Sequence, residues 1–175
     1  MDSDSKQTGR TAEADPGLLG VYLNDHLAGA TLGSELSARL VSAHRDSEDG
    51  AVLERLATEI REDRAALIEL MAALEVPVRQ YKVLLAWAAE KAGRFKPNGR
   101  LLERSPLSSL EELEAMTLGV VGKSGCWRVL RTLADHDDRL DPERLDDLLD
   151  RAERQAETLE ELRLRAGARL ATSAA

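Results

Sequence analysis

Aromatic residues are scarce in this 175-residue chain and make up 3% of the sequence. The β-branched and aromatic residues that favour strands are sparse, whereas Leu, Ala, Arg and Glu, which favour helices, are abundant. With so few aromatics, the core has to consist of Leu, Ala, Val and a few Met side chains. The composition therefore predicts a helical protein, of about the length at which one domain buries a sizeable core.

Cysteine is nearly absent as well, because Cys126 is the only one. It cannot form an internal disulfide, so a reducing cytoplasm is the expected location. The longest uninterrupted apolar run, 83–89, is far shorter than the roughly 20 residues that span a bilayer. A net charge of −8 argues against nucleic acid and anionic membrane as general partners. The polar, acidic residues 1–15 lack the apolar stretch of a signal peptide and are expected to form a disordered tail.

Start and stop signals predict five helices. Asp15 and Pro16 open the first, Pro77 opens the third, and Ser108 with Glu111 forms a capping box that opens the fourth. The expected ranges are 16–44, 51–75, 77–95, 108–135 and 142–167. These helices place a bundle at residues 16–168 and a C-terminal tail at residues 169–175.

The lengths of the connections predict how the helices are arranged. The first two helices share a short turn, as do the last two, so each pair is expected to be antiparallel neighbours. The connection between the pairs contains the shorter third helix and is long enough to travel the length of the bundle. The sequence therefore predicts an all-α four-helix bundle that runs up, down, crossover, down, up, with an extra helix in the crossover.

This arrangement resembles the ferritin-like superfamily, whose four-helix bundles contain one long crossover of this kind. The segments 22–30 (YLNDHLAGA) and 119–123 (GVVGK) also look like those of uncharacterised bacterial ferritin-like proteins. The resemblance covers residues 16–168. It implies a fold and names no activity, because architecture alone does not determine function.

The resemblance raises the question of a metal site. Ferritin-like di-iron proteins use one Glu on each of two helices and a Glu-x-x-His on each of the other two. None of the three histidines here follows a glutamate by three residues. Glu59 and Glu62 have the spacing of that motif, but a carboxylate stands where the histidine would be. We therefore expect no intact di-iron site and no cofactor.

Each of the four long helices has an apolar stripe at helical spacing, and each stripe contains one polar residue. These residues are His26, Asp63, Lys123 and Gln155. The helical rise places them about 14–21 Å from the same end of the bundle, in one layer where ferritin-like proteins hold their metals. The charge of Lys123 would repel a divalent cation, and it could instead pair with Asp63. We therefore predict a buried polar network in place of the metals.

Three interpretations of this layer stay open at this point. It can be a purely structural network that sets the helix register, or a set of solvent-edge positions from which Lys123 and Asp63 reach water. It can also be a site that binds or transforms a molecule. The small-residue run 28–34 likewise suits close helix packing or a small cavity. We favour packing there, because empty space in a core is destabilising.

The function that the sequence favours is that of a metal-free ferritin-like bundle without catalytic residues. It would act by self-association or by binding a protein or a small molecule. A homodimer is expected, because two-fold dimers are the commonest oligomers. The alternative is a carboxylate-bridged di-iron or di-manganese metalloprotein or oxidase with atypical ligands. Those ligands would come from His26, Glu35, Glu59, Glu62 and Asp63.

Overall fold

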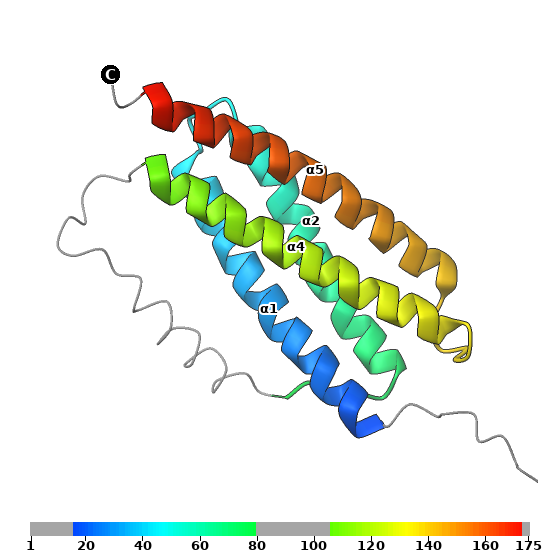
Figure 1. Cartoon of the computed structure of the whole chain (residues 1–175). Coiled ribbons are helices and arrows are strands. Elements are labelled where there is room, and N and C mark those ends of the chain that lie inside the picture. The colour runs from blue at the N-terminus through cyan, green and yellow to red at the C-terminus, as the bar shows by residue number, and fades with distance from the viewer. Residues whose placement is uncertain (1–15, 80–105, 173–175) are drawn as a thin grey trace, which may run out of the picture.

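A computed structural model describes residues 16–79 and 106–172, and all the regular structure in these ranges is α-helical (Figure 1). The helices are α1 (Pro16–Ala43), α2 (Gly50–Ala73), α4 (Pro106–Ala134) and α5 (Pro142–Thr172). They lie side by side as a bundle, which confirms the all-α prediction. No helix within these ranges combines the length and apolar character that crossing a membrane requires.

The start of α4 and the end of α5 differ from the sequence prediction. α4 begins at Pro106, so Ser108 and Glu111 lie inside the helix and the predicted capping box is wrong. A proline suits the first turn of a helix, where its missing N–H has no partner to lose. α5 continues past residue 168 to Thr172, because Arg169 in its last turn contacts Glu48 and Asp49 beside α2.

Other predictions fall on the crossover and the tails. Residues 76–79 have no regular secondary structure, so the predicted third helix does not begin at Pro77. The rest of that helix, at 80–95, lies outside the described residues, as do residues 1–15 and 173–175.

Ion pairs between helices give the directions of the chain. Three arginines of α5 pair with two glutamates of α2 and one in the turn just before it, in reverse order along the chain: Arg144–Glu69, Arg151–Glu62 and Arg169–Glu48. α2 and α5 are therefore antiparallel. α1 packs against α2 and α4, and α4 packs against α5. All neighbouring helices are antiparallel, so α2 and α4 run in the same direction, as the connection lengths predicted (Figure 1).

The predicted apolar stripes form most of the core. The seam of α2 is buried throughout, and its members are Leu53, Leu56, Ile60, Asp63, Leu67, Leu70 and Leu74. The stripes of α4 and α5 are buried at Leu113, Met116, Val120, Trp127, Leu130, Leu148, Ala152, Leu159, Leu162 and Ala166. On α1 the prediction is partly wrong, because Ala30 and Gly33 are only partly buried. The buried residues of α1 include Leu27 beside the predicted Leu23 and Leu40.

Asn24 of α1 fixes the path of the chain after α2. Its buried side-chain amide donates to the backbone oxygens of Gly20, at 2.7 Å, and Pro77, at 3.1 Å. Its side-chain oxygen accepts a hydrogen bond of 2.8 Å from the backbone N–H of Arg79. The chain that follows α2 is therefore held against α1, at the end of the bundle where α1 begins.

Candidate functional site

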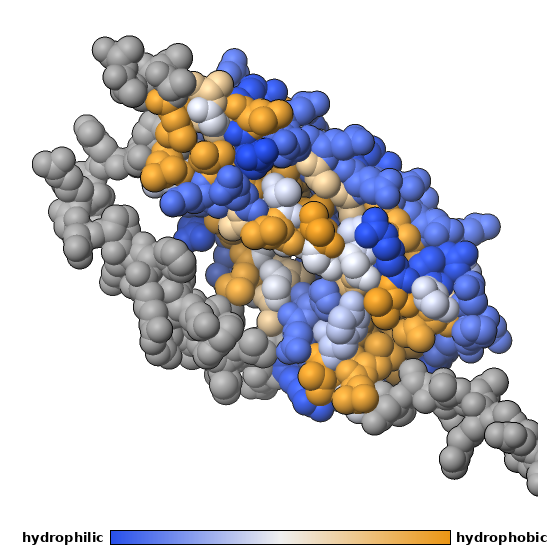
Figure 2. Space-filling model, viewed as in Figure 1, coloured by the Kyte–Doolittle hydropathy of each residue, from blue (hydrophilic) through white to orange (hydrophobic). Residues whose placement is uncertain are grey.

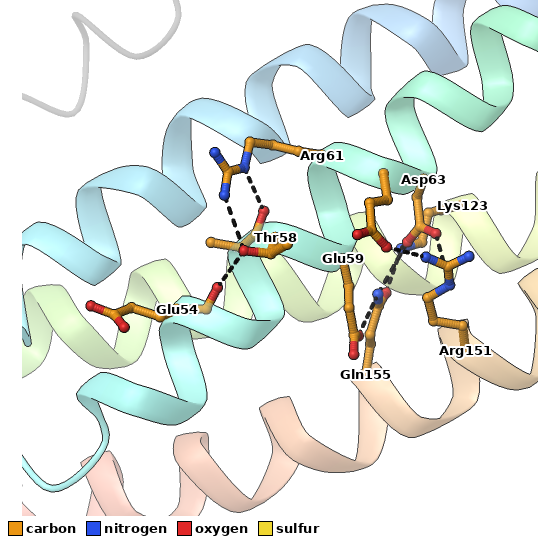
Figure 3. Close-up of polar contacts among 10 residues, drawn as sticks. Glu54, Thr58, Glu59, Arg61, Asp63, Lys123, Arg151 and Gln155 are labelled. Carbon is orange, nitrogen blue, oxygen red and sulfur yellow. Dashed lines mark hydrogen bonds and ion pairs between the residues drawn. The ribbon is translucent and has the colours of Figure 1, made fainter.

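A polar contact between α2, α4 and α5 lies in the middle of the core (Figure 3). The Lys123 Nζ atom of α4 lies 2.5 Å from Asp63 Oδ2 of α2 and 2.5 Å from Gln155 Oε1 of α5. The structure thus brings together three of the four residues of the predicted layer. α2 and α4 run in the same direction, so Asp63 and Lys123 reach the same height from opposite corners of the bundle.

The amide of Gln155 completes the network on the side of α5. Its Nε2 atom donates to Asp63 Oδ2, at 3.1 Å, and to Glu59 Oε2, at 3.0 Å. Its oxygen accepts from Lys123, so one neutral side chain serves both the cation and the anions. Because an amide offers both a donor and an acceptor, Gln155 can hold Lys123 and Asp63 in a single arrangement.

Arg151 belongs to the same cluster and was missed by the sequence analysis. Its Nε atom lies 3.4 Å from Asp63 Oδ1, and its NH1 atom lies 2.8 Å from Glu62 Oε2. Arg151 precedes Gln155 by four residues, which is one helical turn on the same face of α5. That spacing was the feature of the sequence that could have placed Arg151 beside the network. The acidic and basic residues around Arg151 are typical of a solvated helix face, so Arg151 was not predicted to reach the core.

The network is buried on the side of Asp63 and reaches the edge of the core at Lys123. The Asp63 side chain is 1% exposed and the Lys123 side chain 15%. Burial lowers the pKa of the Lys123 ammonium, while the nearby Asp63 carboxylate acts in the opposite direction. Removing Lys123 would therefore leave the Asp63 carboxylate buried without its ammonium partner.

His26, the fourth predicted member of the layer, lies apart from the other three. It is half-buried on α1, and its ring contacts the ring of Tyr22 edge to face with centroids 4.5 Å apart. No hydrogen bond joins it to Asp63, Lys123 or Gln155, so its predicted place in the network is corrected. The phase of α1 explains the difference, because its stripe of small residues turns toward a groove beside α4 rather than into the core.

The position of His26 gives a pH-dependent prediction. Burial lowers its pKa below the usual 6.5, and Asp25 acts in the opposite direction. The unfolded chain therefore binds this proton at a higher pH than the folded chain, so stability should fall as the pH drops below about 6.5 and level off below the folded pKa. The measurement is the urea midpoint from pH 7.5 to 5. His26→Gln should flatten the plot of urea midpoint against pH. Replacing the exposed His136 with Gln should leave the slope of that plot unchanged. Equal slopes of urea midpoint against pH in the parent and in His26→Gln would contradict the prediction.

The groove between α1 and α4 has a volume of about 900 Å³, and its floor is formed by α2. Its lining includes His26 on α1, Lys123 on α4, and Ile60, Asp63 and Leu67 on α2. Figure 2 shows apolar and near-neutral residues gathered over α1 and α4, whereas the strongly hydrophilic residues of this view lie mostly along α5. The ion-paired layer therefore adjoins an open, largely apolar groove.

Glycines widen this groove. A Cβ atom built on Gly29 or Gly33 of α1, or on Gly119 or Gly122 of α4, would meet no atom within 4 Å. Close helix packing, which we favoured for residues 28–34, would bring a neighbour against these positions. That interpretation is wrong for Gly29 and Gly33. The small residues instead leave the space that forms the groove.

Other reactive side chains lie near the groove or at its far end. Burial raises the pKa of the Cys126 thiol to about 12, so this residue is a protonated thiol at neutral pH. Burial also raises the pKa of the Tyr22 hydroxyl, and its interaction with Cys126 adds to that effect. Farther along, the Nε2 atom of His44 lies 3.1 Å from the Oγ atom of Ser109 and joins the end of α1 to the start of α4.

The candidate metal ligands are dispersed or engaged elsewhere. Glu59 accepts a hydrogen bond from Gln155 and Glu62 pairs with Arg151, while Glu35 is exposed on α1. Within residues 16–79 and 106–172, no three His, Cys, Asp or Glu side chains are placed to hold one metal ion.

No protein-family model, curated protein or solved structure matches the chain. The resemblance to ferritin-like proteins therefore stays a hypothesis.

Proposed function

We propose that this chain is a metal-free bundle of the ferritin-like type that acts by binding another molecule. The observation that carries the proposal is the Lys123 ammonium, which lies 2.5 Å from both Asp63 Oδ2 and Gln155 Oε1 in the middle of the bundle. Ferritin-like proteins hold their metal ions at this level with carboxylates. Here a fixed cation neutralises the central carboxylate and would repel a divalent ion in the same place.

The surroundings of Asp63 support the same proposal. Arg151 approaches its second oxygen, at 3.4 Å, so the carboxylate faces a cation on two sides. Of the ligands in the alternative hypothesis, Glu62 also contacts Arg151, and His26 and Glu35 face the groove. A di-metal enzyme would need these groups to converge on two ions.

Binding is favoured over catalysis by the state of the reactive groups. The Cys126 thiol, with its pKa raised to about 12, is a poor nucleophile at neutral pH. Asp63 Oδ2 accepts hydrogen bonds from Lys123 and Gln155, whereas the buried Oδ1 has no hydrogen-bond partner among the described residues and is approached by Arg151 Nε at 3.4 Å. These contacts join α2, α4 and α5 at one height, and the open groove beside them offers space for a ligand.

The proposal predicts the metal content of the protein. Protein purified without chelator should contain well under one iron, manganese or zinc ion per chain, as measured by elemental analysis. Ferrous iron added in air should show no saturable oxidation. Lys123→Glu would place a carboxylate beside Asp63 and Glu59, so this variant is expected to take up more metal than the parent. One tightly held ion per parent chain would overturn the proposal and favour the di-metal alternative.

A further inference from the structure

The two walls of the groove face each other at matching heights. Tyr22 of α1 and Cys126 of α4 both line it, and each alters the pKa of the other, so they lie at about the same height on these antiparallel helices. Moving seven residues along α1 from Tyr22 reaches Gly29, and moving seven residues back along α4 from Cys126 reaches Gly119. The two glycines are therefore level, and each leaves open space where a side chain would begin.

The space between these walls has the size and lining of a small-molecule site. Its volume of about 900 Å³ falls within the roughly 300–1,000 Å³ of ligand pockets in proteins. Apolar contacts come from all three helices, with Leu36 on α1, Leu67 on α2 and Met116 on α4 among them. Such sites combine an apolar body with a few polar groups that orient the ligand.

The charges that line the groove are balanced. Three basic and three acidic side chains line it, and they are Lys123, Arg39, Arg64, Asp25, Glu35 and Asp63. Lys123 is already paired with Asp63, and Arg64 donates to the Thr31 hydroxyl at 3.0 Å. Because the lining charges sum to zero, a charged ligand would lose hydration here without a net opposite charge to offset the loss. The groove therefore favours an uncharged ligand, although the protein has a net charge of −8.

Polar atoms remain for one hydrogen-bonding group on such a ligand. The Lys123 ammonium has three N–H donors, and its two contacts with Asp63 and Gln155 leave the third. His26, on the opposite wall, is half-buried and lines the groove. A neutral imidazole offers one donor and one acceptor. A hydroxyl or carbonyl oxygen placed between α1 and α4 would therefore find a donor on either side.

We propose that the groove between α1 and α4 binds a small, mostly apolar, uncharged molecule that has a hydroxyl or carbonyl oxygen. Its apolar body lies over Gly29 and Gly119, and its oxygen points toward Lys123 and His26. This inference deepens the proposed function and rests on it, because it names the class of molecule that the metal-free bundle binds.

The test is a titration of the full chain with N-phenyl-1-naphthylamine, an uncharged apolar probe whose fluorescence rises in apolar surroundings. Saturable binding of one probe per chain is expected, and 1-decanol should displace it at lower concentration than decanoate does. Gly119→Leu and Gly29→Leu each extend a side chain into the groove from one wall and should weaken probe binding at least tenfold. Gly125→Leu makes the same change on α4 outside the groove lining and should leave binding within twofold of the parent.

Circular dichroism of each variant checks that the helices are retained. Gly119→Leu and Gly29→Leu fill the groove from opposite walls, so the test does not depend on one variant. No saturable binding to the parent, or equal weakening by Gly125→Leu and Gly119→Leu, would overturn the proposal. Stronger displacement by decanoate than by 1-decanol would overturn the uncharged class. If Gly119→Leu left probe binding intact and instead dissociated the predicted homodimer, the groove would be an interface between copies. The metal measurement does not depend on these variants, so the two proposals fail separately.

Discussion

Lys123→Met is expected to lower the free energy of unfolding by about 3–5 kcal/mol, because it leaves a buried carboxylate without its ammonium partner. That carboxylate belongs to Asp63, whose side chain is 1% exposed. Arg151 Nε, at 3.4 Å from its other oxygen, remains and keeps the loss from exceeding this range. Asp63→Leu should cost less, toward about 3 kcal/mol, because the stranded ammonium lies beside the groove and can turn toward water.

Urea unfolding followed by circular dichroism measures both losses. Arg128→Met is the matched control, since Arg128 lies on the same helix and pairs with Glu153 at 3.9 Å where both side chains are more than 60% exposed. An exposed pair of this kind contributes little, so the control should change stability only slightly. A loss for Lys123→Met as small as that for Arg128→Met would show that the layer is solvated.

Gly50→Ala is expected to cost about 1–3 kcal/mol, because the added methyl group has no room beside the backbone. A Cβ atom at Gly50 would lie 2.8 Å from the carbonyl oxygen of His44 and 2.9 Å from that of Arg45. Both carbonyl oxygens belong to the turn between α1 and α2, so relief requires the turn to move. The buried Asp49, which Arg165 and Arg169 contact, holds that turn in place.

Gly125→Ala makes the same change on α4, where a Cβ atom would meet no atom within 4 Å. It should raise stability by up to about 1 kcal/mol, because Ala is the better helix former. Opposite signs for the two substitutions in the same urea assay are therefore expected. A neutral or stabilising Gly50→Ala would contradict the close approach of the turn to the start of α2.

The sequence was sufficient for the parts of the fold that depend on local signals. Proline and polar turns located α1, α2, α4 and α5, although the predicted third helix does not begin at Pro77, and the short and long connections gave the directions of these four helices. The seam of α2 was predictable because its apolar residues repeat without interruption except at Asp63. Asp63, Lys123 and Gln155 could be placed at one height, since helical rise converts residue numbers into distance.

The errors arose where the tertiary contact decides the role of a residue. Small residues do not show whether a neighbour fills the space beside them, so Gly29 and Gly33 suggested packing although they border a groove. His26 was misplaced for the same reason, because the part of α1 on which it lies faces that groove and not the core. Arg151 was concealed because a charged residue on an acidic helix is typical of a solvated face. Only the approach of α2 brings Asp63 within 3.4 Å of it.

The central claim is that Asp63 and Lys123 form one buried unit in place of a metal site, and the coupling energy between them tests it most directly. The measurement is the free energy of unfolding of Asp63→Leu, Lys123→Met and the double variant. Replacing both charges with apolar side chains leaves neither stranded, so the double variant should lose far less than the sum of the single losses. Losses that are small and additive would contradict the claim, because they are the result expected for two independent, solvated side chains.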